Sequence, residues 1–110
     1  MLQRRRMIDA WRKWVKEIAR IVKKHLPGSQ VYLIGSIARG DYIGASDVDI
    51  LVVVPVSEYP KGILAKAKIK SIIEEELKLP YYHPFEIHIV TPSEAVFFMR
   101  RGKVLVVEEA

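Results

Sequence analysis

One segment constrains the fold of this chain more than any other. From Ile50 to Val54 the sequence reads Ile-Leu-Val-Val-Val, five consecutive apolar residues. Successive side chains of a β-strand point to opposite faces of its sheet, so an uninterrupted apolar run is typical of a strand buried on both faces. The sequence therefore predicts an α/β domain, with a mixed sheet flanked by helices. At 110 residues we expect a single domain, residues 1–110.

Two aspartates lie at the start of this strand. Asp47 and Asp49 are two positions apart, so they point to one side of the strand, about 7 Å from each other at a rise of roughly 3.3 Å per residue. Two like charges at the mouth of an apolar strand favour a bound cation, and Mg²⁺ prefers carboxylate and phosphate oxygens. A turn after the loop at 40–46 would explain Asp47 but not Asp49, which lies inside the strand pattern.

A glycine and a serine follow the preceding apolar run. We expect Val31–Ile34 to form a buried strand that ends at Gly35-Ser36, where the helix-compatible residues 37–39 begin. Glycine lets the backbone approach a ligand closely, and the free N–H groups of a helix start favour an anion such as phosphate. The Ser36 hydroxyl group could cap the helix or bind a phosphate oxygen, and the sequence leaves both roles open.

A third acid lies on a later strand. The segment Phe85–Val90 alternates, with Phe85, Ile87 and Ile89 on one face, and with Glu86, His88 and Val90 on the other. If this strand is a neighbour of the Asp47–Asp49 strand, three carboxylates converge. The alternative for Glu86 is a solvent-facing residue, and for His88 contact with a base, a phosphate or only solvent is open.

These motifs together resemble a known group of enzymes. Gly35-Ser36, ten intervening residues, Asp47-Val48-Asp49 and a lone acid on a later strand are similar to the pattern of the polymerase β-type nucleotidyltransferase superfamily. In so short a chain, Gly-Ser-Ile-Ala-Arg-Gly-Asp followed by Ser-Asp-Val-Asp-Ile resembles its minimal nucleotidyltransferase branch. Many members of that branch are encoded beside a helical HEPN-domain protein, as toxin–antitoxin pairs.

The resemblance implies roles for five residues of the motif. Gly35 and Ser36 would hold a nucleoside triphosphate, and Asp47 and Asp49 would bind two Mg²⁺ ions. Glu86 would complete the metal site and help to deprotonate the acceptor. The superfamily commonly has aspartate where this chain has Glu86, which is one methylene longer, so that its geometry at the metal would differ.

The function implied is transfer of a nucleoside monophosphate, AMP from ATP, onto an acceptor hydroxyl group. The resemblance points to a HEPN-type toxin protein as the acceptor, which makes this chain an antitoxin. Arg39 would bind the triphosphate or steady the loop, and a bond back to Asp41 is an equal alternative. The rival hypothesis is a non-catalytic antitoxin that neutralises its partner by occlusion.

Four further segments complete the predicted architecture. A capping box at Thr91-Pro92-Ser93-Glu94 predicts a helix over 95–101 that Gly102 ends, and in it Phe97, Phe98 and Met99 cannot all face one core. Val104–Val107 is either an edge strand or a tail that pairs with a partner. Two longer helices are expected: an amphipathic one over 1–26, and one over 61–79 with an apolar stripe of Ile63, Leu64, Ala67, Ile72, Ile73 and Leu77.

Composition limits the class of protein. The net charge is +5, with many Lys and Arg residues in the first predicted helix, and this basic face is solvated or binds an acidic partner. RNA is the less favoured acceptor, since no aromatic and basic stacking pattern accompanies the charge. The chain has no Cys and no apolar segment near the roughly 18 residues that span a bilayer. We expect no membrane partner and a soluble, cytoplasmic protein.

Overall fold

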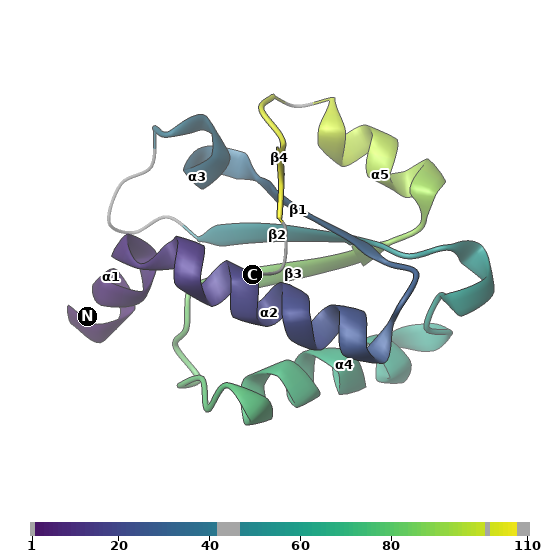
Figure 1. Ribbon diagram of the computed structural model, residues 1–110, viewed down its shortest axis with the longest axis horizontal. Coiled ribbons are helices and arrows are strands. Elements are labelled where there is room, and N and C mark those ends of the chain that lie inside the picture. The colour runs from purple at the N-terminus through teal and green to yellow at the C-terminus, as the bar shows by residue number, and fades with distance from the viewer. Residues whose placement is uncertain (1, 42–46, 101, 108–110) are drawn as a thin grey trace.

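The computed structural model describes residues 2–41, 47–100 and 102–107, so that residues 42–46 of the predicted loop at 40–46 lie outside the described residues. Its elements form a mixed sheet with helices on both faces, as predicted (Figure 1). No helix among the described residues is long and apolar enough to cross a membrane. The strands are β1 (Gln30–Ile34), β2 (Val48–Val53), β3 (Phe85–Val90) and β4 (Leu105–Val106).

The sheet has the order β3-β2-β1-β4. Strands β2 and β3 are parallel, and β1 is antiparallel to both β2 and β4. Ile50, Leu51 and Val52 of the central strand β2 are completely buried, which confirms that this run is covered on both faces. Val104–Val107 contains the edge strand β4, so of the two alternatives for this segment the strand is correct.

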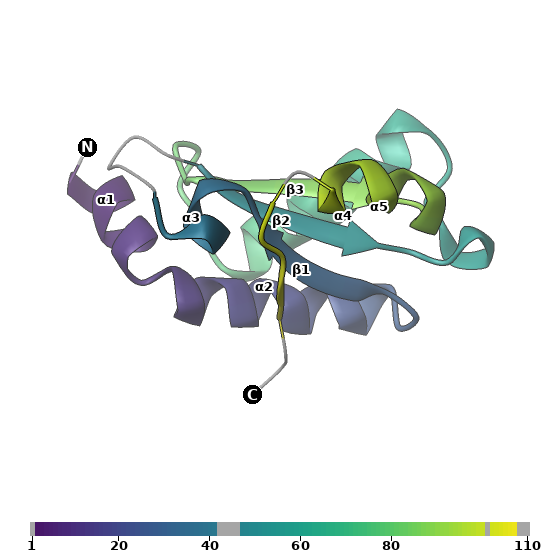
Figure 2. The ribbon, with the colours of Figure 1, turned by 90° about the horizontal axis from the view of Figure 1, so that it is seen from above.

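Helices cover the two faces unequally. The long helices α2 and α4 pack side by side on the face that carries Ile50 and Ile87 (Figures 1 and 2), and α5 packs on the other face against β2 and β3. The helices are α1 (Leu2–Asp9), α2 (Trp11–His25), α3 (Gly35–Arg39), α4 (Gly62–Glu76) and α5 (Pro92–Met99), with a 3₁₀ turn at Val56–Glu58.

Strand register brings the candidate residues to one end of the sheet. Because β2 and β3 are parallel, they begin at the same edge, and Asp49 is paired with Glu86 across the ladder. Because β1 is antiparallel to β2, β1 ends at that edge, and Ile34 is paired with Asp49. Paired residues share a face of a sheet. The face that carries Asp49 and Glu86 is therefore the face on which α5 packs.

The prediction of one helix over 1–26 is wrong. The chain forms two helices, α1 and α2, separated by a turn at Ala10 (φ −99°, ψ 27°). Buried residues occur on both sides of the turn, Ile8 before it and Val15 after it. The apolar periodicity thus continues across the break and could not reveal it. The change of direction lets α1 reach the start of β2, where Arg4 contacts Asp47.

The predicted stripe of the helix over 61–79 is correct only in its second half. Ile73 is completely buried, and Ile72 and Leu77 pack against the core. Ile63 and Leu64 are 85% and 86% exposed, and Ala67 is also exposed, because the first turns of α4 do not pack on the sheet. The helix ends at Glu76, three residues before Leu79.

Helix α5 begins with the predicted capping box. Thr91 Oγ1 accepts a hydrogen bond from the Glu94 backbone N–H, and Glu94 Oε1 accepts one of 2.9 Å from the Thr91 N–H. The hydrogen bond from the Thr91 backbone, followed by that from its side chain, lowers the pKa of Glu94 below its ordinary value. The helix ends at Met99, earlier than predicted. Phe98 and Met99 pack on the sheet while Phe97 is 69% exposed, so the three do face different ways.

We predict that Thr91→Val lowers the free energy of unfolding by about 1 kcal/mol, because valine keeps the shape but removes the capping oxygen. Urea denaturation measures this change, and Thr91→Ser, which retains a hydroxyl group, is the control. Folding lowers the pKa of Glu94, so its charged carboxylate stabilises the folded protein at neutral pH. This stabilisation is lost as the pH falls through the folded pKa. Equal unfolding of Thr91→Val and the wild type would mean that the cap does not stabilise α5.

Candidate active site

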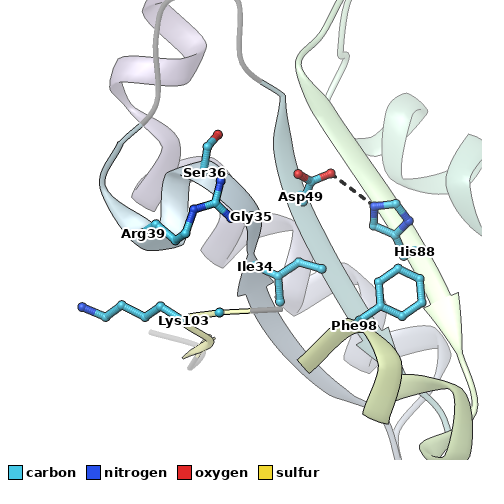
Figure 3. A pocket seen from close by; sticks show the side chains of 9 residues that line it. Ile34, Gly35, Ser36, Arg39, Asp49, His88, Phe98 and Lys103 are labelled. Carbon is cyan, nitrogen blue, oxygen red and sulfur yellow. Dashed lines mark hydrogen bonds and ion pairs between the residues drawn. The ribbon is translucent and has the colours of Figure 1, made fainter. Parts of the chain in front are cut away.

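A pocket of about 410 Å³ opens at the end of the sheet where β1 ends and β2 begins (Figure 3). Its volume is within the range of small-molecule sites. The end of β1, helix α3, strands β2 and β3, helix α5 and the segment before β4 all contribute to it. The lining residues are Ile34, Gly35, Ser36, Arg39, Asp49, His88, Phe98, Gly102 and Lys103.

Gly35 is pressed against the carboxylate of Asp49. A Cβ atom at position 35 would lie 2.5 Å from Asp49 Oδ2, closer than real Cβ contacts. Gly35 also has a φ of +78°, a backbone conformation that side-chain-bearing residues rarely adopt. Both features follow from the register that pairs Ile34 with Asp49. The glycine of the predicted phosphate loop and an aspartate of the predicted metal pair therefore line the same pocket.

Ser36 and Arg39 lie on the short helix α3 beside Gly35. In the part of the chain that the structure describes, no side chain caps α3, so the capping role that the sequence left open for Ser36 is wrong. Arg39 Nε donates to Asp41 Oδ2 at 3.2 Å, and the guanidinium group also lines the pocket. The bond back to Asp41 is therefore present, and binding of a triphosphate by Arg39 remains a prediction.

Asp49 has a histidine as its neighbour. His88 Nε2 lies 3.2 Å from Asp49 Oδ1, and both side chains are about one third exposed or less, at 27% and 31%. The sequence left contact with a base, a phosphate or solvent open for His88. Asp49 was not among these alternatives. The contact arises because β3 is parallel to β2, so that the two residues lie on one face. The histidine can fix the orientation of the carboxylate.

Asp47 is paired with an arginine, outside the pocket. Arg4 Nη2 donates to Asp47 Oδ1 at 2.6 Å, and the aspartate side chain is 53% exposed. Nothing in the sequence indicated this pair, because the residues are 43 positions apart. The sequence showed only that the first predicted helix is basic, without indicating a partner for Arg4. Each aspartate of the pair therefore has a positively charged or hydrogen-bonding partner from another element.

Glu86 lies beside Asp49 in the sheet but does not line the same pocket. Its side chain is exposed, and it contributes to a shallow depression with Lys70, Glu74 and His83. Among the described residues, no three His, Asp or Glu side chains are arranged to hold a metal ion. The neighbouring strands place the acids on one face at one edge, but the three carboxylates do not meet at one point. The predicted roles of Glu86 remain predictions.

The donor atoms suit a hard divalent cation. Asp47, directly before β2, and Asp49, within it, provide carboxylate oxygens near the start of this strand. Mg²⁺ in proteins is usually held by one or two carboxylates together with substrate phosphates and water. A preformed cluster of three acids is therefore not required. The contacts with Arg4 and His88 show that both carboxylates accept positively charged partners or donors. The residues present fit a magnesium ion that arrives with a phosphate-bearing ligand.

Five pocket residues were not predicted as site residues: Ile34, which ends β1, and four residues from later elements. His88, Phe98, Gly102 and Lys103 come from β3, α5 and the segment before β4. Gly102 was predicted only as a helix end, yet a Cβ atom there would lie 3.6 Å from Arg39 Cδ. The adjacent residues Phe97, Phe98 and Met99 indicated that at least one of these side chains lies outside the core. The sequence could not show which of them faces the pocket.

The fold and the pocket bring a glycine turn, an arginine and one aspartate of the predicted pair together at the end of the sheet. Residues 15–106 match the model of the nucleotidyltransferase domain family, and the chain belongs to that family. Membership supports nucleotidyl transfer as its general activity. No protein of curated function matches this chain.

Solved structures show the same fold. A proposed nucleotidyltransferase from Sulfolobus solfataricus is 22% identical, with a TM-score of 0.67 over 92% of this chain and 82% of that one. Another proposed nucleotidyltransferase is 32% identical, with a TM-score of 0.65 over 84% of this chain and 96% of that one. A toxin–antitoxin with AMP-PNP is 14% identical, with a TM-score of 0.52 over 86% of this chain and 72% of that one. The first and third show the fold alone.

We predict that Gly35→Ala weakens binding of ATP with Mg²⁺ by about tenfold, because the added methyl group displaces the Asp49 carboxylate. Gly62→Ala is the matched control, since Gly62 also has a positive φ, +87°, but has open space around its missing Cβ. Both variants lose about 1 kcal/mol of stability from the left-handed backbone. Isothermal titration calorimetry compares the two, and equal ATP affinities would contradict the prediction.

Proposed function

We propose that this protein transfers AMP from ATP to a hydroxyl group of a partner protein, with Mg²⁺ as cofactor, and that it acts as an antitoxin. Members of its family generally use a nucleoside triphosphate and a divalent metal ion. The observation that carries the proposal is the contact between Gly35 and Asp49, because it joins a phosphate-binding turn and a metal-binding carboxylate in one pocket.

Three residues of the pocket would bind the triphosphate. The backbone of Gly35 allows a phosphate group to approach without a Cβ in the way, and the Ser36 hydroxyl group donates to a phosphate oxygen. Arg39 has five N–H donors, of which Asp41 takes the one on Nε, so its Nη groups remain able to bind phosphate. These contacts orient the triphosphate so that its α-phosphorus faces the start of β2.

Asp47 and Asp49 would hold two magnesium ions, which would supply charge stabilisation at the phosphate and lower the pKa of an attacking hydroxyl group. The Asp49 carboxylate is already oriented by His88 at 3.2 Å. The Asp47 carboxylate is held by Arg4 at 2.6 Å, and the guanidinium group of Arg4 would provide a positive charge near the phosphates of a bound nucleotide.

Glu86 is the proposed general base. It lies on the edge strand β3, in register with Asp49, and its side chain is exposed. The acceptor oxygen attacks the α-phosphorus in line, a P–O ester bond forms, and the bond to the β-phosphate breaks so that pyrophosphate leaves. The hydroxyl proton passes to the Glu86 carboxylate. The exposure of Glu86 and Asp47 suits an acceptor group on the surface of another protein rather than a small enclosed substrate.

The choice of nucleotide and partner is supported by a structural neighbour. The toxin–antitoxin with AMP-PNP shares the fold at a TM-score of 0.52. That likeness, together with the resemblance to minimal nucleotidyltransferases, is the reason to propose ATP as donor and a HEPN-type toxin as acceptor.

A second candidate function is neutralisation of the toxin by occlusion without turnover. It is favoured by the adjacent apolar side chains of Ile63 and Leu64 on α4, which are 85% and 86% exposed. Surface apolar residues of this size suit contact with another protein.

We predict that Asp49→Asn lowers transfer of label from α-³²P-ATP to the partner toxin by about 100-fold or more, because the metal site loses a charge. Label from γ-³²P-ATP is transferred by neither protein, since the γ-phosphate leaves with pyrophosphate. Asp9→Asn, on the exposed end of α1, is the matched control and retains transfer.

The same variants separate the two candidate functions. A transferase loses both labelling and neutralisation of the toxin in Asp49→Asn, while the variant still binds the toxin. Undiminished neutralisation by Asp49→Asn, with no labelling by the wild type, would establish occlusion instead.

A further inference from the structure

The pocket has an apolar wall opposite its phosphate-binding turn. Figure 3 shows the ring of Phe98, from α5, beside His88 and across the pocket from Ser36, with Ile34 between them at the base. The ring centroids of Phe98 and His88 are 5.3 Å apart, at an angle of 43°. The wall therefore carries an aromatic ring at the end of the pocket that the proposed phosphate contacts leave free.

Phe98 is fixed in place by the core but is not enclosed by it. It packs against the buried cluster of Ile34, Leu51, Val90 and Ala95, while it also lines the pocket and remains only partly buried. The preceding residue, Phe97, points to solvent and is 69% exposed. A ring that is anchored on one side and open to a pocket on the other is a rigid surface for stacking.

We propose that the nucleobase of the bound nucleoside triphosphate stacks on Phe98. This inference rests on the proposed function and adds to it the direction in which the nucleotide lies. The phosphates occupy the Gly35–Ser36 end of the pocket, and the nucleoside extends toward α5. Because every base has a π-face, the contact adds affinity for a nucleoside without selecting among bases.

The other lining residues are less suited to this role. The imidazole ring of His88 is held at Asp49 by its contact of 3.2 Å, so it orients a carboxylate. Ile34 is apolar but has no aromatic face. Gly102 and Lys103 lie on the segment before β4 and offer a backbone and a charged amine. Among the described residues that line the pocket, His88 and Phe98 have aromatic rings. His88 contacts the Asp49 carboxylate, which leaves the ring of Phe98 for stacking.

The test compares ATP with inorganic tripolyphosphate, which has the phosphates but no nucleoside. Isothermal titration calorimetry in Mg²⁺ measures the affinities of the wild type, Phe98→Leu and Phe97→Leu. Leucine retains most of the apolar volume, so α5 stays packed. We expect Phe98→Leu to bind ATP roughly tenfold more weakly, and GTP by the same factor, with tripolyphosphate binding unchanged. Phe97→Leu, one residue away on the exposed side, leaves all three affinities unchanged.

Two further variants keep the result interpretable. Phe98→Tyr retains the ring and should retain ATP affinity, and Phe98→Met replaces the ring by a flexible chain of similar volume if the leucine variant does not fold. Equal ATP affinity in Phe98→Leu and the wild type would overturn the stacking contact. Parallel loss of ATP and tripolyphosphate binding would assign Phe98 a purely structural role. A wild type that binds neither ligand would overturn the proposed function itself.

Discussion

The pairing of β1 with β2 is the constraint on which the site depends. Strand β2 is buried on both faces, so its register is fixed by packing, and the antiparallel partner β1 must end opposite Asp49. The chain can turn there only because Gly35 has no side chain, since a Cβ atom would lie 2.5 Å from the carboxylate. A slip of one residue in this ladder would send Asp49 to the opposite face and separate the turn from the acid.

The site is assembled from segments that are distant in the sequence. Helix α1 brings Arg4 to Asp47, strand β3 brings His88 to Asp49, and the segment before β4 brings Gly102 beneath Arg39. Each contact fills the space or balances the charge around a group that the two central strands already position. The sheet therefore sets where the pocket lies, and the helices and the last strand set which side chains surround it.

The sequence predicted those features that follow from alternation and from local hydrogen bonding. The buried strand at Ile50, the two faces of β3 and the capping box at Thr91 are of this kind. The break at Ala10 and the exposure of Ile63 escaped prediction, because an apolar period reports which residues share a stripe but not whether anything packs against it. The contacts of His88 and Phe98 in the site depend on how β3 and α5 lie against β2, which no local pattern contains.

The rim of the pocket is tied to the sheet by its shortest strand. Gly102 and Lys103 line the pocket, and the segment that carries them is held to β1 by the pairing of Leu105 and Val106 in β4 and by a hydrogen bond from the Val107 N–H to the Val31 carbonyl oxygen. This pairing is the shortest in the sheet, so local opening would begin at this edge rather than in the central strands. A ligand that contacts the rim would then hold β4 in place, and occupancy of the pocket would be coupled to the order of the edge strand.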